Sequence, residues 1–416
     1  MRVCYVTMQF PAPSETFASN DVRELTRLGV RISVHGLLPE HRSADRLIRE
    51  RRLEPVSISH NGIRATARGV ARALAQRRLL AEAIGWLLRS SAGRLVELVR
   101  SLVLLPRAFD ILAEIGQSRP QVVHIYWGHY PAIVGFLVQR ALPEVATSIS
   151  LAAYDLEMAF GGTRAVARNS QVIRTLGRVN VPGVAALTGV PPEQIEVIHD
   201  GVDIAFLEGV AAGRRKVARR VVTAGRLIES KGVDDVLAAF ATLGSRWPDA
   251  SLVILGDGPE RERLRAQAAR LGIEDRVSFP GHVSQERVIE ELAAAEVFLL
   301  LSRKSSERLP NVVKEGMACR AVCITTPTPG IDELVVDGET GLIVPMHAPE
   351  AAAQAIDDVF AGRVPAGMAD GAREHVVRNF DMAHTSREYL RVWRAAADRH
   401  AAARRAAAPV RGARAT

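Results

Sequence analysis

The sequence predicts an α/β protein with two doubly wound domains, each built on a parallel sheet. Short runs rich in branched apolar residues alternate with segments of helical periodicity in two successive series, and a polar, basic stretch separates them. Such alternation is typical of parallel strands joined by helices that cover both faces of a sheet. The chain has 416 residues, 48% of them hydrophobic, which is enough for two domains with a core each.

The first domain is expected over residues 1–203. Its short apolar runs predict strands at residues 2–7, 30–37, 121–125, 147–151, 172–174 and 195–198. Helical periodicity is found over residues 15–28 and from Pro131 onward, and the proline-rich residues 8–14 form a loop. The arginine-rich residues 41–110 are expected to be mostly helical, with a break at Asn61-Gly62.

Residues 204–220 are the expected linker, because a turn-like His-Asp-Gly-Val-Asp sequence leads into a polar, basic stretch.

The second domain is expected over residues 221–380. Its strands are expected at residues 221–224, 252–255, 276–279, 297–301, 322–325 and 342–344, and its helices at 233–243, 260–271, 285–295, 311–318 and 350–360. A C-terminal helix over 381–400 is expected to pack back on the first domain, and residues 401–416 are expected to be disordered. Since ligands of doubly wound domains sit at the carboxyl ends of the strands, the expected site is a cleft between the domains.

Cysteine content and hydropathy point to a cytoplasmic protein. The three cysteines, Cys4, Cys319 and Cys323, are too few for a disulfide framework. No apolar run reaches the roughly 18 residues that a membrane span needs. The first ten residues lack the charged, apolar and cleavage regions of a signal peptide.

The net charge of +8 is concentrated in residues 41–110, which hold fourteen arginines and six acidic residues. This segment has no aromatic ladder and no known nucleic-acid module, so nucleic-acid binding is not favoured. Two interpretations stay open. The favoured one is a solvated helical face. The other is a basic amphipathic surface that lies on an anionic membrane at its inner face. Its apolar side would comprise Ile84, Trp86, Leu87, Leu88, Leu95, Val96, Leu98 and Val99.

A loop at residues 225–232 has a composition that suits a diphosphate. It leaves a predicted strand and enters a helix through two glycines, and it carries Arg226 and Lys231. A planar guanidinium and a compact ammonium together neutralise two phosphates well. Lys231 is one of only four lysines in an arginine-dominated chain, which favours a specific need for an ammonium. Taken alone, the loop also fits a helix entry with two solvated charges.

A second polar loop follows the predicted strand at 297–301. Pro310 marks a helix start, so the amides at 311–313 are free to bind an anion. Glu307 and Glu315 flank this start and can accept hydrogen bonds from sugar and ribose hydroxyls. Weaker signals are the glycine turn at Gly256, which also fits a structural turn, and His282, which also fits an ordinary surface histidine.

Together these motifs resemble the retaining glycosyltransferase family 4, of the GT-B fold, in its bacterial exopolysaccharide-type branch. The matching residues are Gly225-Arg226…Lys231-Gly232, Leu255-Gly256-Asp257-Gly258, Phe279-Pro280-Gly281-His282-Val283, Glu307-x7-Glu315, Asn311, Met317-Ala318, Asp337-Gly338…Thr340-Gly341-Leu342, Pro13-Ser14-Glu15-Thr16-Phe17 and Val197-Ile198-His199-Asp200-Gly201-Val202-Asp203. The resemblance covers nearly the full chain except the arginine-rich segment and the tail.

The resemblance implies a role for each matching residue. Arg226 and Lys231 would neutralise a nucleotide diphosphate, Glu307 would contact the donor sugar, and these three would be the catalytic residues. Further donor contacts are implied for Gly256, His282, Val283, Leu309, Asn311, Val312 and Glu315, with the base near His282 and Val283 and the ribose on Glu315. The acceptor side would comprise Ser14, Glu15, Thr16, His129 and Asp155.

The implied reaction is the metal-independent transfer of a sugar, with retention, from a nucleotide-diphosphate donor, UDP-sugar being favoured. The acceptor would be a glycan, a lipid-linked sugar or a small molecule in polysaccharide or glycoconjugate biosynthesis. No cofactor is expected, because the Asp-x-Asp metal motif of other transferases is not found where it would be needed.

One departure from the family pattern leaves an alternative open. Ala152 stands where the branch usually has a histidine near the reactive face of the sugar. His124 and His129 are candidates to replace it, although each also fits a structural role, His124 more than His129. The alternative is a weakened, glycosyltransferase-like binding or scaffold protein that partners an active transferase. An epimerase or phosphorylase of the same fold is less favoured.

Overall fold

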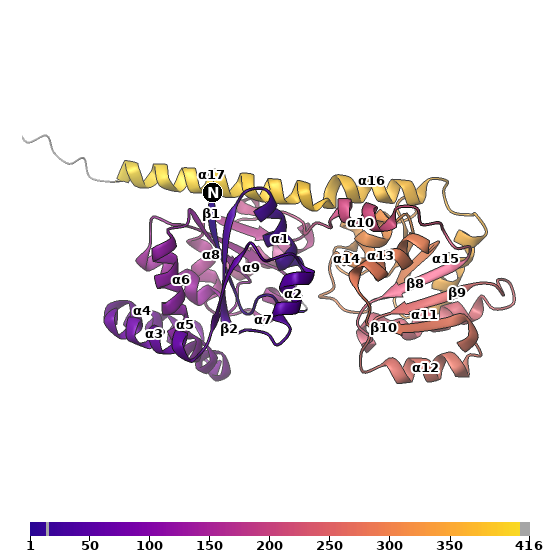
Figure 1. The fold of residues 1–416 in the computed structure, drawn as a ribbon, viewed down its shortest axis with the longest axis horizontal. Helices are drawn as coiled ribbons and strands as arrows, with labels where there is room; N and C mark the ends of the chain where they lie inside the picture. The colour runs from indigo at the N-terminus through magenta and orange to yellow at the C-terminus, as the bar shows by residue number, and fades with distance from the viewer. Residues whose placement is uncertain (14–15, 408–416) are drawn as a thin grey trace, which may run out of the picture. The chain divides into compact units, whose positions relative to one another are not determined.

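The computed structural model describes residues 1–13 and 16–407. The chain forms two compact units. Unit 1 comprises Met1–Asp200 and the chain from Thr385 onward, and unit 2 comprises Gly201–His384. Both are parallel α/β domains, as the sequence predicts (Figure 1). The predicted cleft between them stays a prediction.

Unit 1 is built on a seven-stranded parallel sheet of order β3-β2-β1-β4-β5-β6-β7. Its strands are β1 (Arg2–Thr7), β2 (Arg31–Pro39), β3 (Ser57–Asn61), β4 (Val122–Tyr126), β5 (Ala146–Leu151), β6 (Val172–Thr175) and β7 (Ile195–Val197). Successive residues of a strand point to opposite faces. Val3 and Tyr5 of β1 therefore enter one core, and Cys4 and Val6 enter the other.

Helices cover both faces of this sheet. They are α1 (Thr16–Arg27), α2 (Ala44–Glu50), α3 (Ile63–Ala75), α4 (Arg77–Ser90), α5 (Leu95–Ser118), α6 (Ala132–Ala141), α7 (Ala153–Met158), α8 (Thr163–Arg168), α9 (Val181–Thr188) and α17 (Met382–Ala407). Residues of α4, α5, α6 and α8 enter the core on the face of Cys4, and residues of α1 and α17 enter the core on the face of Tyr5. In Figure 1, α3, α4 and α5 lie together on one side of unit 1.

The helix α17 is an integral part of unit 1. Its Tyr389 and Trp393 are fully buried. The Trp393 indole donates to Ser148 Oγ at 3.0 Å, and the Tyr389 hydroxyl lies 2.7 Å from His124 Nε2. The expected disorder from residue 401 is wrong for residues 401–407, which extend this helix, and residues 408–416 lie outside the described part of the chain.

The arginine-rich segment is helical and is held to the unit by a buried carboxylate. Asp110 of α5 is ion-paired with Arg107 of the same helix at 2.7 Å and with Arg68 of α3 at 2.8 Å, and Arg72 of α3 also bonds it. The two helices cross so closely that a β-carbon at Gly69 would lie 1.9 Å from the Pro106 carbonyl oxygen.

Unit 2 has a six-stranded parallel sheet of order β10-β9-β8-β11-β12-β13. Its strands are β8 (Arg220–Ala224), β9 (Ser251–Leu255), β10 (Val277–Gly281), β11 (Val297–Leu300), β12 (Val322–Thr325) and β13 (Leu342–Ile343). Its helices are α10 (Ile204–Ala211), α11 (Val233–Thr242), α12 (Arg261–Arg270), α13 (Gln285–Ala294), α14 (Asn311–Ala318), α15 (Pro349–Phe360) and α16 (Met368–Phe380).

The predicted linker, residues 204–220, lies entirely within unit 2. Residues 204–211 form α10, whose Ile204 and Leu207 are buried in the core of this unit. Asp203 caps the helix by accepting a hydrogen bond from the Phe206 amide at 3.0 Å.

Among the described residues, none of the helices combines the length and the apolar character that a membrane span requires.

The close crossing of α3 and α5 makes Gly69 a sensitive position. We expect Gly69→Ala to lower the free energy of unfolding by about 2–3 kcal/mol, because the added methyl group would force the two backbones apart. Urea denaturation followed by circular dichroism measures this loss. Gly116→Ala in α5 is the matched control, since its β-carbon would meet only Leu142 at 3.9 Å, and it should be neutral or stabilising by about 1 kcal/mol. Equal losses in the two variants would contradict the crossing.

Candidate functional site

The strand order of unit 2 creates a favourable place for a ligand. In the order β10-β9-β8-β11-β12-β13, the chain winds outward in one direction from β8 and then in the other from β11. The loops after these two neighbouring strands therefore lead to opposite sides, and ligands of doubly wound domains bind at this switch point. The loops at residues 225–232 and 301–310 follow β8 and β11.

Lys231 and Glu307 meet across this switch point. The Lys231 ammonium is ion-paired with Glu307 Oε1, and the Ser302 hydroxyl donates a hydrogen bond to Glu307 Oε2. The two charged side chains keep 21% and 13% of their surface exposed, so the pair is largely sheltered but still accessible. A charge-assisted bond of this kind fixes both side chains in one orientation.

A backbone hydrogen bond holds the two loops together beneath this ion pair. The Ser230 carbonyl accepts from the Arg303 amide at 2.8 Å, and the Ser302 hydroxyl, whose hydrogen is donated to Glu307, lies 3.1 Å from the same carbonyl oxygen. Lys231 and Glu307 are therefore carried by segments that are bonded to one another, which is the support that a preorganised site needs.

Gly256 allows the loops after β8 and β9 to approach closely. Its φ is +131°, and a β-carbon there would lie 1.9 Å from the Gly225 carbonyl oxygen. Only glycine fits such a position without moving the backbone. Gly256 thus shapes the site by keeping the loop of Arg226 and Lys231 close to the strand ends.

The start of α14 presents free backbone amides. Pro310 is the N-cap, and its side chain makes no capping hydrogen bond. The Asn311 and Val312 amides have no acceptor among the described residues and suit an anion. The Val313 amide, which was also expected to be free, instead donates to the Pro310 carbonyl at 3.1 Å. Leu309, just before Pro310, has φ of +51° with its side chain buried in the core of unit 2. This left-handed conformation costs energy in a residue other than glycine, and residues held in such conformations cluster at ligand sites. The Asn311 side chain already accepts a bond from the buried Lys314 ammonium at 3.0 Å, so Asn311 offers its amide group and its backbone to a ligand.

Glu315 lies one turn into α14, at the loop that follows β10. Gln285 donates to Glu315 Oε1 at 3.2 Å, which ties α14 to the segment that contains His282 and Val283. His282 is exposed and Val283 is half-buried. Desolvation of the Glu315 carboxyl group raises its pKa to about 7, although the residue keeps part of its surface in solvent.

The predicted donor residues are thus only partly in contact with one another. Lys231 and Glu307 touch directly. Arg226 is exposed on its loop and makes no ion pair with any residue in the described ranges, and Glu315 contacts Gln285 rather than Lys231 or Glu307. Sequence reasoning missed Ser302 and Gln285 as partners of the two glutamates. The position of Ser302 directly after a buried strand was the available signal for it.

The predicted acceptor residues of unit 1 lie at the carboxyl ends of β4 and β5. The buried Asp155 accepts hydrogen bonds from the Gly128 amide at 2.7 Å and the Ala152 amide at 2.9 Å, and His129 Nδ1 lies 3.3 Å from it. Asp155 therefore joins two loops and orients His129. Thr16 is exposed at the start of α1, and Ser14 and Glu15 lie outside the described residues.

His124 does not belong to this acceptor edge. It is fully buried on β4 between Ser148 and Tyr389, and burial lowers its pKa well below the usual value. A neutral histidine with these partners is part of the core, which is the structural role that the sequence favoured.

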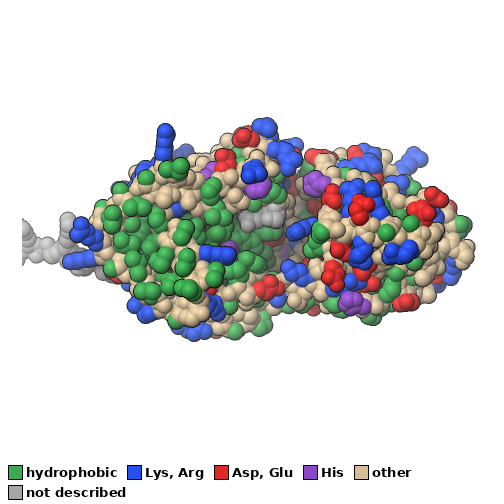
Figure 2. Space-filling model, turned by 90° about the horizontal axis from the view of Figure 1, so that it is seen from below, with side chains coloured by type: hydrophobic (Ala, Val, Ile, Leu, Met, Phe, Trp, Pro, Cys, Tyr) green, Lys and Arg blue, Asp and Glu red, His purple; other side chains and the backbone are tan. Residues whose placement is uncertain are grey.

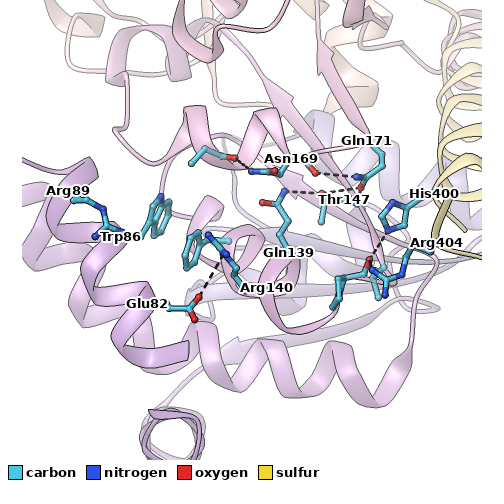
Figure 3. Close-up of a pocket in the computed structure, with 14 residues that line it drawn as sticks. Glu82, Trp86, Arg89, Gln139, Arg140, Thr147, Asn169, Gln171, His400 and Arg404 are labelled. Carbon is cyan, nitrogen blue, oxygen red and sulfur yellow. Dashed lines mark hydrogen bonds and ion pairs between the residues drawn. The ribbon is translucent and has the colours of Figure 1, made fainter. Parts of the chain in front are cut away.

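A cavity of about 490 Å³ lies elsewhere in unit 1 (Figure 3). It is bordered by Val145 and Thr147 at the start of β5, by Gln171 just before β6, and by His400 and Arg404 of α17. It thus opens at the amino ends of the strands and contains none of the predicted site residues. Most of its polar groups bond one another or the backbone, as His400 and Arg404 do with the Pro143 carbonyl at 2.8 Å.

The raised pKa of Glu315 gives a pH-dependent contribution to stability. Because the folded protein holds the proton more tightly than the unfolded chain does, this contribution is greatest below pH 4.5 and is lost as the pH rises toward 7. We expect Glu315→Gln to remove a pH-dependent loss of up to about 3 kcal/mol between pH 4.5 and 8. Urea denaturation of both proteins across this range measures the difference. Parallel stability curves for the two proteins would contradict the shift.

Comparison with known proteins identifies the family. Residues 211–375 match the family model described as glycosyl transferases group 1. The chain is 32% identical over 304 residues to the D-inositol 3-phosphate glycosyltransferase of Mycolicibacterium gilvum, covering 66% of each chain. It is 39% identical over 151 residues to the N-acetyl-alpha-D-glucosaminyl L-malate synthase of Bacillus anthracis, covering 36% of this chain and 38% of that one. The chain spans between about a third and two thirds of the length of such curated relatives.

Solved structures show the same fold at low sequence identity. Anabaena Alr3699/HepE in complex with UDP superposes with a TM-score of 0.70 at 17% identity, covering 95% of this chain and 100% of that one. Sucrose-phosphate synthase from Thermosynechococcus elongatus gives 0.65 at 15% identity, covering 95% and 98%. With its two parallel α/β units, the chain has the GT-B fold and belongs to the family of glycosyl transferases group 1.

Proposed function

We propose that this protein is a glycosyltransferase that moves a sugar from a nucleoside-diphosphate donor to a hydroxyl-bearing acceptor with retention. The observation that carries the proposal is the ion pair between Lys231 and Glu307 at the switch point of unit 2. It places a cation for a phosphate beside a carboxylate for a sugar hydroxyl, and the free amides of α14 belong to the same loop.

The donor is a UDP-sugar in this proposal. One structural relative was solved with UDP and also with UDP-glucose, and curated relatives are named for transfer to inositol phosphate and for mannosyl transfer from GDP-mannose. The base would bind near His282 and Val283, and Glu315 would accept hydrogen bonds from the ribose. Gln285 holds Glu315 next to that loop.

The chemical step depends on stabilising charge on the leaving diphosphate. The bond between the anomeric carbon and the phosphate oxygen breaks, and the acceptor oxygen bonds that carbon from the same face. The hydroxyl proton passes to the departing phosphate oxygen. Lys231 and Arg226 would neutralise the growing negative charge, and preorganised cations lower such a barrier more than a side-chain base would. Glu307, held by Ser302 when Lys231 turns to the phosphate, would orient the sugar.

The acceptor would bind at the carboxyl edge of unit 1, beside His129. Asp155 would act as a positioning residue, because its oxygens are occupied by protein donors. The products would be polysaccharides or glycoconjugates. Ala152 favours one second candidate, a weakened transferase-like protein that binds the donor and partners an active enzyme, since a methyl group cannot stabilise charge at the sugar.

Nucleotide binding gives the first test of the proposal. We expect UDP at about 100 times its Kd to raise the Tm by about 5 °C, since a ligand at that concentration adds about 2.7 kcal/mol. Lys231→Ala should remove most of the shift, because it deletes the cation at the switch point. Arg270→Ala, which removes an exposed charge at the end of α12, is the control and should keep the shift. If no nucleoside diphosphate shifts the Tm, the donor site proposed here does not exist.

Metal independence is the second test. We expect the release of UDP from a UDP-sugar to proceed at an unchanged rate in excess chelator, because side-chain cations and amides carry the charge of the leaving group. A coupled assay for UDP measures the rate. Full loss of activity in chelator, restored by added Mg²⁺, would contradict this mechanism. Nucleotide binding without transfer to any acceptor would favour the scaffold alternative.

A further inference from the structure

Three packed helices of unit 1 expose an unusual number of apolar side chains. Each of these nine side chains on α3, α4 and α5 leaves more than a third of its surface in solvent: Ile63, Val70, Leu74, Leu88, Leu95, Val96, Val99, Leu102 and Val103. Figure 2 shows hydrophobic side chains gathered over this part of unit 1, with basic side chains around and among them. We call these nine residues the apolar face. Contiguous exposed apolar surface of this kind marks a site of interaction.

The apolar face follows from the periodicity of the helices. In α5, the exposed residues Leu95, Val96, Val99, Leu102 and Val103 repeat at helical spacing on one side. Leu104, Leu105 and Ala108 on the other side are buried in the core. The helix is thus apolar on both sides along this stretch, and one side has no partner among the described residues.

This face differs from the one expected from the sequence. Trp86 and Leu87 are buried in the core, and Trp86 stacks on Phe136 with ring centroids 4.3 Å apart. Ile84 and Leu98 are half-buried, whereas Leu88, Leu95, Val96 and Val99 are exposed as expected. The rotational orientation of each helix about its own axis decides which of these residues reach the surface.

The charges on the same helices are unequally neutralised. The four acidic residues of α3–α5, Glu82, Glu97, Asp110 and Glu114, are all ion-paired with arginines. Five exposed arginines on these helices have no ion pair within the described chain: Arg64, Arg77, Arg78, Arg89 and Arg100. The apolar face therefore carries a surplus of positive charge.

The apolar face reaches the edge of unit 1 where the acceptor is proposed to bind. The start of α5 packs on residues 159–161, which follow the short helix α7 that contains Asp155. Arg94 donates to the Ala159 carbonyl, and the Gly161 amide donates to Glu97 at 3.3 Å. A β-carbon at Gly161 would lie 1.7 Å from the Ser90 carbonyl oxygen, so the backbones touch. Leu95 and Val96 thus lie at the same edge of the sheet as His129.

We propose that the apolar face docks on an anionic lipid leaflet and turns the acceptor edge of unit 1 toward it. Apolar side chains enter the boundary between headgroups and acyl chains, and the five arginines attract anionic headgroups. A second copy of this chain fits less well, because a two-fold interface would bring the same five arginines together. The orientation rests on the proposed function, and it makes a lipid-borne acceptor the substrate class that this surface serves.

Sedimentation of the full chain with lipid vesicles tests the docking. We expect the protein to sediment with vesicles of phosphatidylcholine and phosphatidylglycerol, and weakly with phosphatidylcholine alone. Val96→Asp and Val103→Asp should each weaken binding about tenfold or more, since a buried apolar side chain is lost and a negative charge is added. Arg78→Gln and Arg100→Gln should each weaken it about fivefold. Leu271→Asp, at an exposed apolar residue of unit 2, is the control and should bind as the wild type does.

The outcomes separate this proposal from the proposed function. Vesicle binding is measured without nucleotide, and the UDP-induced shift in Tm of Val96→Asp should equal that of the wild type, which also shows that the variant is folded. Equal recovery of the wild type with and without vesicles would overturn the proposal. So would a wild-type dimer in solution that Val96→Asp converts to a monomer, because a second copy would then cover the face. If docking orients the acceptor edge, Val96→Asp should slow sugar transfer to a lipid-borne acceptor. Transfer to a soluble acceptor should stay unchanged. Equal slowing of both reactions would overturn the proposed orientation.

Discussion

The bond between Lys231 and Glu307 is the interaction on which the candidate donor site depends. Lys231 and Glu307 come from two separate loops. These loops lie side by side because the strand order of unit 2 places β8 beside β11. The Ser230 carbonyl then holds the second loop to the first by accepting a hydrogen bond from the Arg303 amide. The Glu307 carboxylate balances the charge of the Lys231 ammonium, whereas Arg226 on the same loop makes no ion pair among the described residues.

Unit 1 uses a buried carboxylate for a similar purpose at a different place. Asp155 accepts hydrogen bonds from the amides of Gly128 and Ala152, which follow the neighbouring strands β4 and β5, and His129 lies beside it. The two units thus share a principle: loops at the carboxyl ends of strands are joined by charged or strongly polar bonds before any ligand arrives. Binding then costs less ordering of the protein.

The sequence was most informative where local pattern and tertiary structure agree. Buried strands such as β8 and β11 are nearly continuous apolar runs, so their existence and their order along the chain could be predicted, and with them the fold. It was less informative for strands with many polar residues and for helices with few buried apolar residues. β3 reads Ser-Ile-Ser-His-Asn at the sheet edge, and α16 spaces its buried Met368, Ala372, Val376 and Phe380 four apart around a glycine. The occupied oxygens of Asp155 could not be predicted, because they depend on how two distant loops meet.

The place of α17 in the chain has a consequence for biosynthesis. Residues of α17, with Tyr389 and Trp393 the largest of them, fill a core whose members outside this helix come from the first 200 residues. On the ribosome, the first unit emerges with a gap on that face of its sheet, and the gap closes only after all of the second unit has been translated. Unit 1 can therefore complete this core only after α17 has been translated, and a chain that stops before α17 leaves the core incomplete.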